Sequence, residues 1–169
     1  RKDCDYLIVL YHGGKEHYRY PSPNLQKICR KFVRAGANLV VCQHSHCVGC
    51  KEDYQDGTIV YGQGNFLFDD SDSEFWQTSL LLSVNDRSVS YLPLVKRKNT
   101  VRLAHGQEAE AILRGFEERS AQILDEAFVR EEYARFSQQL LSLYLGTFTQ
   151  KRHRLLFRVL NKLTRGKWS

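Results

Sequence analysis

The stretch Val40-Val41-Cys42-Gln43-His44-Ser45-His46 decides how this chain is organised. An apolar run precedes the two histidines and predicts a buried strand over residues 38–42. In an extended chain, side chains two residues apart point to the same face, so His44 and His46 are expected to lie together. Two imidazoles on one face can ligate one metal ion or two adjacent ones.

A third histidine occupies an equivalent place earlier in the chain. His12 follows an apolar run that predicts a strand over Asp5–Tyr11, and Gly13 and Gly14 come directly after it. A strand end that opens into a loop is a common location for a functional site. Two such exits carrying histidine indicate a site more strongly than one H-x-H pair. The alternative is that these are ordinary polar loop residues.

A helix is expected between the two strands. Ser22 is a suitable N-cap, and Pro23 is a suitable first helical residue, so the helix should run to Ala35 and stop at Gly36. Strand, helix and strand in about forty residues form a βαβ unit with parallel strands. Further strands are predicted at 48–54, 58–61, 77–84 and 88–95.

The pattern becomes helical from Gly106 onward. Apolar residues recur at helical spacing, which predicts three helices. The chain is therefore divided into an α/β part, residues 1–100, and a helical extension, residues 101–169. The expected helices are 106–124, 126–145 and 151–163.

Three segments resemble the bacterial capsule synthesis family called CapA, which is associated with poly-γ-glutamate capsules. Residues 11–16 are similar to its H-x-G-x-E motif, residues 35–46 to its G-A-D-x-V…H-P-H motif, and residues 59–66 to its Y-S-x-G-N-F motif. The resemblance covers about residues 5 to 70. It implies the α/β calcineurin-like metallophosphoesterase fold, a β-sandwich flanked by helices, of which this chain would be the C-terminal half with a helical extension.

The resemblance also implies a two-metal hydrolase site. His12, His44 and His46 would bind two divalent ions, Mn, Fe or Zn, which activate a bridging water against a phosphate or acyl group. Glu16 would orient His12 or another ligand, and Asn65 would donate to a substrate oxygen. A solvated carboxylate and a turn residue are the alternatives for these two. The expected substrate is an anionic polymer or a phosphorylated or acyl compound.

Two departures from the family pattern change the expectation. The family has Gly-His-His-Pro-His where this chain has Cys42-Gln43-His44-Ser45-His46. The family's Asp and Asn-Asn-His motifs belong to an N-terminal half that this sequence does not contain. We therefore expect the site to be incomplete and inactive in this chain alone. The missing half of the domain is the expected partner, and exposed sheet edges would allow a homo-oligomer.

Composition narrows the class of protein. With 42% hydrophobic and 12% aromatic residues, the sequence is that of a globular protein. It contains no apolar run of about 18 residues, so no transmembrane segment is expected. Five cysteines without a regular spacing favour a reducing compartment. The expected location is cytoplasmic or peripheral to a membrane.

A structural zinc site is the first alternative function. Cys42, His44, His46, Cys47 and Cys50 lie within nine residues, and the last two cysteines form a C-x-x-C pair. A second C-x-x-C pair, which would strengthen this interpretation, is not present. The cysteines would otherwise be small buried residues.

A binding module is the second alternative. Residues 149–169 carry seven lysines and arginines and no acid, which leaves 18 basic and 19 acidic residues elsewhere. Residues 151–168 form a basic amphipathic pattern that suits an anionic membrane surface. Nucleic acid is not expected, because no nucleic-acid motif accompanies the tail. Packing of this helix on the preceding acidic helices is the simpler interpretation.

Overall fold

The computed structural model describes residues 4–67, 73–97 and 100–148. The chain divides into two compact units, Arg1–Val129 and Arg130–Ser169. The first unit contains the strands of the described residues and the helices α1 to α3. Helix α4 (Glu126–Phe148) begins in the first unit and continues in the second. The helix predicted at 151–163 lies outside the described residues.

A four-stranded sheet with the order β1-β2-β4-β3 forms the centre of the first unit. Strands β1 (Ile8–Tyr11) and β2 (Leu39–Cys42) are parallel, as predicted for the βαβ unit, and β4 (Gly57–Val60) is parallel to β2. Strand β3 (Lys51–Tyr54) pairs antiparallel with β4. The mixed α/β class is therefore confirmed, although β1 begins three residues later than the apolar pattern suggests.

Helix α1 (Pro23–Arg34) forms where its capping residues predict it. The Ser22 hydroxyl accepts a hydrogen bond of 3.1 Å from the backbone N–H of Leu25, which satisfies a donor that the helix itself leaves free. The helix ends before Gly36, whose φ of 109° is one that glycine adopts without a steric penalty.

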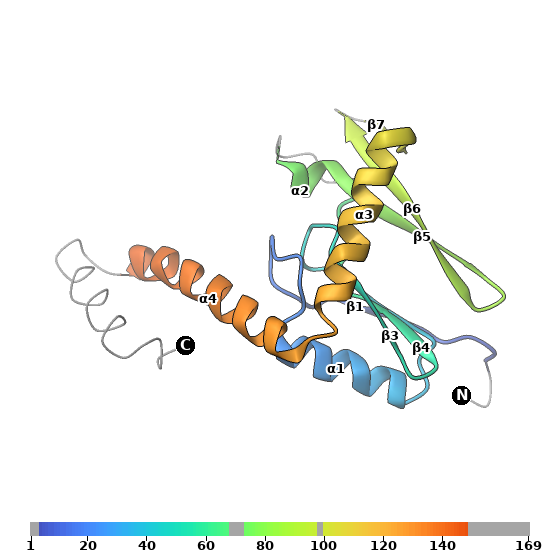
Figure 1. Ribbon diagram of the computed structural model, residues 1–169, viewed down its shortest axis with the longest axis horizontal. Helices are drawn as coiled ribbons and strands as arrows, with labels where there is room; N and C mark the ends of the chain where they lie inside the picture. The colour runs from blue at the N-terminus through green and yellow to red at the C-terminus, as the bar shows by residue number, and fades with distance from the viewer. Residues whose placement is uncertain (1–3, 68–72, 98–99, 149–169) are drawn as a thin grey trace. The chain divides into compact units, whose positions relative to one another are not determined.

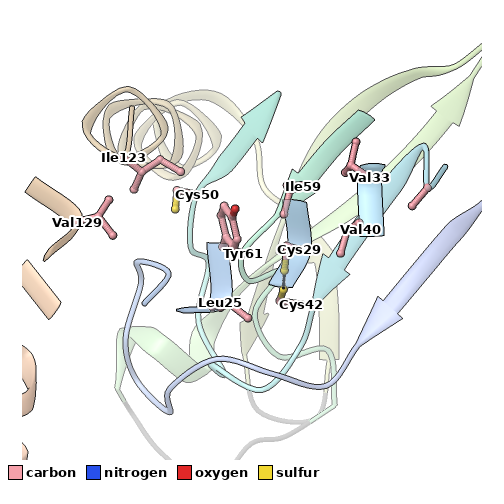
Figure 2. Close-up of a cluster of buried hydrophobic side chains, with 11 residues drawn as sticks. Leu25, Cys29, Val33, Val40, Cys42, Cys50, Ile59, Tyr61, Ile123 and Val129 are labelled. Carbon is pink, nitrogen blue, oxygen red and sulfur yellow. Dashed lines mark hydrogen bonds between the residues drawn. The ribbon is translucent and has the colours of Figure 1, made fainter. Parts of the chain in front are cut away.

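The central sheet is buried on both faces. Val40 and Cys42 of β2 face α1, together with Ile59 and Tyr61, and form the cluster drawn in Figure 2. Leu39 and Val41 belong to a second cluster on the opposite face. Burial on alternating sides explains why β2 is a continuous apolar run and not an alternating one. Each such side chain contributes about 1.5–3 kcal/mol to folding.

A second sheet, of three strands, packs against Leu39 and Val41 and so completes the second cluster. Its strands are β5 (Thr78–Asn85), β6 (Ser88–Arg97) and β7 (Thr100–Leu103), in that order. Asp86 and Arg87 both have positive φ, as a two-residue hairpin turn requires, so the predicted hairpin is confirmed. Strand β7 and the short helix α2 (Glu74–Gln77), which contacts β5 and β6, were not predicted.

Helix α3 (Gly106–Gln122) contacts strands of both sheets, β3 and β6 (Figure 1). Phe116 is fully buried in the second cluster, where it packs with Leu80 of β5 and against Tyr91 of β6. The helices predicted at 106–124 and 126–145 are confirmed within a few residues. Among the helices of the described segments, none is both long enough and apolar enough to cross a membrane.

Candidate functional site

The parallel pairing of β1 and β2 brings His12 and His44 together. Tyr11 lies opposite Cys42 in the register, and the backbone N–H of Gln43 donates to the Tyr11 carbonyl at 3.2 Å. The C-terminal ends of parallel strands meet at one edge of a sheet, which is where ligands bind in open α/β sheets. The two imidazole ring centroids are 4.8 Å apart.

His44 has one ring nitrogen without a partner. Its Nδ1 atom is buried and makes no hydrogen bond with the residues that the structure describes. Leaving a buried polar atom unsatisfied costs about 1–3 kcal/mol. A metal ion, a substrate group or a proton donor at this position would remove that penalty.

His46 is held by Asn65. The Asn65 side-chain N–H donates to the His46 carbonyl at 2.9 Å, and Asn65 Oδ1 lies 2.8 Å from His46 Nδ1. Because a carbonyl only accepts, the first bond sets the orientation of the amide. The second bond must then run from a protonated Nδ1 to Oδ1. With the proton on Nδ1, the lone pair of the imidazole lies on Nε2.

The sequence predicts that His44 and His46 lie together because the chain is extended there. The predicted extended conformation is wrong. Residues 44 and 45 form a turn, and His46 has a φ of 57°, so the alternation of an extended chain does not apply. The turn nevertheless leaves the two ring centroids 6.0 Å apart. The three predicted histidines therefore lie next to one another in the order His12, His44, His46.

The glycine-spaced loop after β4 makes room for this turn. Ser45, in the turn that carries the histidines, is buried. The Ser45 backbone carbonyl accepts a hydrogen bond of 2.8 Å from the His17 backbone N–H. A Cβ on Gly62 would approach the Ser45 hydroxyl to 2.6 Å and the Cys47 carbonyl to 2.7 Å. Gly62, with a φ of 155°, is therefore required by close packing of the loop against the turn that carries the histidines.

Two aromatic residues of α2 lie against the site. Trp76 stacks on His46 with a centroid distance of 5.1 Å and an interplanar angle of 18°. Phe75 stacks in the same way on His17, at 5.6 Å and 11°. Neither contact is predictable from the sequence, since a four-residue helix carries no detectable periodicity. The only available signal was the Phe75-Trp76 pair itself.

Glu16 and the cysteines are placed differently from the histidines. Glu16 is exposed and forms no hydrogen bond or ion pair with the described residues.

Cys47 and Cys50 are buried free thiols, and burial raises the pKa of both, that of Cys47 to about 11. Among residues 4–67, 73–97 and 100–148, no three His, Cys, Asp or Glu side chains are grouped so that they could hold one metal ion.

Comparison with known proteins places the site within a matched segment. Residues 1–70 match the model of the family described as bacterial capsule synthesis protein PGA_cap. The capsule biosynthesis protein CapA of Bacillus anthracis is 36% identical over 67 residues, which are 40% of this chain and 16% of that protein. The PGA biosynthesis protein CapA of Bacillus subtilis is 33% identical over 69 residues, 41% of this chain and 18% of that protein.

The matched segment spans less than a fifth of either relative. It nevertheless includes His12, His44, His46 and Asn65, together with strands β1 to β4 and helix α1. The similarity therefore lies in the part of the chain that carries the three histidines. Residues 1–70 of this chain are therefore similar to the CapA-like capsule synthesis proteins.

Proposed function

We propose that this chain is part of a CapA-like protein of capsule or poly-γ-glutamate biosynthesis, and that its strand exits form a metal-dependent, phosphoesterase-like hydrolase site. The names of the two relatives support the process. The observation that carries the site is the pairing of His12 with His44, whose buried Nδ1 lacks a partner in the described structure.

The donor type suits a divalent transition metal, although the described side chains include no group of three that could hold one ion by itself. Neutral imidazoles suit Mn, Fe and Zn, and His12, His44 and His46 would be the residues that hold the ions. Bound ions would lower the pKa of a coordinated water and polarise a phosphate or acyl oxygen. Three histidines supply too few donors for two ions, so the remaining ligands would come from another part of the parent protein. The calcineurin-like sandwich is part of this proposal, with the central sheet and the β5-β6-β7 sheet as its two layers.

The surrounding residues would set the state of the histidines. Asn65 would keep the proton of His46 on Nδ1, which places the lone pair on Nε2, and Trp76 stacks on one face of the same ring. Both polar atoms of the Asn65 amide are engaged with His46, which favours a positioning role over direct donation to a substrate. Glu16, being exposed, remains accessible to a ligand or to another part of the parent protein.

The test is metal binding by the purified chain, measured by elemental mass spectrometry after dialysis against Mn, Fe or Zn. Near-stoichiometric metal in the wild type and its loss in His44→Ala would support the proposal. His105→Ala is the matched control, because His105 is exposed at the start of α3 and makes no side-chain capping bond. Metal that persists in His44→Ala but disappears in a Cys47→Ser/Cys50→Ser variant would favour the structural zinc alternative.

A further inference from the structure

A polar cavity lies at the opposite edge of the central sheet from the histidines. Its volume of about 400 Å³ is within the range of about 300–1,000 Å³ that is typical of small-ligand sites. Asn38, which directly precedes β2, forms part of its wall, whereas His44 follows the same strand. The other polar side chains come from the segment before β1, from β3, β4 and the turn between them, and from the β5-β6 turn: Tyr6, Asp53, Gln55, Asp56, Thr58 and Arg87.

Asn38 contributes an unused hydrogen-bond donor to this cavity. The residue is 7% exposed, and its Oδ1 atom accepts a hydrogen bond of 2.9 Å from the backbone N–H of Leu7. Because an N–H must donate to the oxygen of the amide, this bond fixes which end of the amide lies at Leu7. Nδ2 makes no hydrogen bond with the residues that the structure describes. A buried donor without a partner is unfavourable, and a ligand oxygen in the cavity would satisfy it.

Arg87 contributes a positive charge from the second sheet. It belongs to the β5-β6 turn, with a φ of 71°, and its guanidinium forms no ion pair within the described segments. Burial raises the pKa of the Tyr6 hydroxyl, and the charge of Arg87 opposes that shift, so the guanidinium lies near Tyr6 at the cavity wall. A guanidinium and an amide N–H₂ group on one cavity are donors that suit a carboxylate.

Asp56 contributes the opposite charge. It belongs to the β3-β4 turn, and its carboxylate makes no hydrogen bond or ion pair with described residues. The neighbouring Asp53 is already engaged, since it accepts from the Thr58 hydroxyl at 2.8 Å and lies 3.7 Å from the ammonium of Lys51. Asp56 and Arg87 therefore line one cavity with opposite charges that are not paired with each other. A ligand that carries both a cation and an anion pairs with both of them.

We propose that this cavity binds a small zwitterion, an α-amino acid with an uncharged polar side chain. The ligand carboxylate accepts from Arg87 and from Asn38 Nδ2, and the ligand ammonium donates to Asp56. The side-chain amide of Gln55, which has no hydrogen-bond partner among the described residues, binds the polar side chain of the ligand. The site lies apart from the histidines and does not depend on the proposed metal chemistry.

The test titrates the whole chain with L-glutamine. Binding is followed by calorimetry and by the rise in the melting temperature that ligand binding to the folded state produces. Two analogues are the matched ligands: 4-aminobutanamide lacks the carboxylate, and 4-carbamoylbutanoate lacks the ammonium. Each should bind about tenfold more weakly or worse, as expected when hydrogen bonds between charged groups are lost.

Variants assign each charge of the ligand to a side chain. Arg87→Gln and Asp56→Asn should each weaken L-glutamine binding by a similar factor, about tenfold or more. Arg87→Gln should no longer distinguish L-glutamine from 4-aminobutanamide, because the partner of the carboxylate is gone. Asn38→Asp keeps an oxygen for the Leu7 N–H but replaces the donor with a negative charge, so it should abolish binding. Thermal unfolding shows whether this variant has folded.

Arg97→Gln and Asp86→Asn are the matched controls. Arg97 is exposed at the other end of β6, and Asp86 adjoins Arg87 in the turn, but neither lines the cavity. Both variants should bind L-glutamine like the wild type. The proposal is overturned if L-glutamine does not bind the wild type saturably, or if both analogues bind as tightly as L-glutamine. It is also overturned if the controls lose as much affinity as Arg87→Gln and Asp56→Asn, which would indicate general charge attraction.

Discussion

Asn65 and His46 are joined at two points, through the Asn65 amide and both the ring and the carbonyl of the histidine. Asn65→Ala should therefore release the proton of His46 to either nitrogen. In ¹⁵N spectra of the imidazoles, we expect the wild type to show the Nδ1–H form and the variant to show a mixture. If metal binds as proposed, the affinity should fall about 10- to 100-fold, the usual effect of removing a group that orients a ligand. Unchanged spectra would contradict the two-point arrangement.

A buried ion pair between α1 and β3 should be sensitive to the loss of either partner. Arg30 contacts the Glu52 carboxylate through Nε and Nη2 at 2.7 Å each, and the Tyr61 hydroxyl donates to Glu52 at 2.6 Å. Arg30→Met leaves the carboxylate, whose side chain is 5% exposed, without its cation. We expect a loss of about 3–5 kcal/mol in the free energy of unfolding, measured with urea. Tyr61→Phe should cost about 1–3 kcal/mol.

The exposed pair of Arg135 with Glu132 provides the comparison for this measurement. Arg135→Met should change stability by no more than about 1 kcal/mol, because solvent screens such pairs. Similar losses in Arg30→Met and Arg135→Met would show that burial of Glu52 contributes little.

Alkaline pH should destabilise the fold through its buried thiols. Burial raises the pKa of Cys47 to about 11, and Cys50 shifts in the same direction for the same reason. Unfolded thiols ionise near pH 8.5, roughly, so the unfolded state releases protons first as the pH rises. The contribution of the buried thiols to the free energy of unfolding should be fully present below about pH 8.5. It should be lost as the pH rises toward 11. Cys47→Ala should have a shallower slope than the wild type, while Cys4→Ser, at an exposed position, should not.

Gly62 should tolerate a methyl group less well than Gly106. Both have positive φ, 155° and 53°, but only Gly62 has atoms in the way of a Cβ. Gly106→Ala should cost about 1–2 kcal/mol from backbone strain alone. Gly62→Ala adds collisions with Ser45 and Cys47 and should cost more, with a loss of the contact between His46 and Asn65. Thermal unfolding of both variants tests the difference, and equal costs would show that the loop can move aside.

The position of His12 beside His44 can be predicted from patterns in the sequence. Apolar runs predict β1 and β2, and Ser22-Pro23 predicts the start of the helix that makes them parallel. Parallel neighbours place their C-terminal ends, and the histidines after them, at one edge. Each of these steps depends on local chemistry, so each is readable before the structure is known.

Other parts of the site depend on contacts between distant residues. The turn at His46 is stabilised by Asn65, which lies 19 positions away, and Trp76 belongs to a helix of only four residues. Arg119 of α3 donates to the carbonyls of Val48 and Gly49, which lie 71 and 70 positions earlier in the chain. No periodicity or spacing in the sequence encodes such contacts. They arise from tertiary packing, which can override helix propensity. Gly115, for example, lies inside α3 although glycine is unfavourable in a helix interior.

The distribution of cysteines has a practical consequence. Cys4 is exposed, whereas Cys29, Cys42, Cys47 and Cys50 are buried as free thiols, with the sulfur atoms of Cys29 and Cys42 3.5 Å apart across α1 and β2. A thiol-specific reagent should titrate one sulfur of the folded chain at once and the other four only when the core opens. The rate of that slower reaction measures how often α1 separates from the sheet, without any label being introduced.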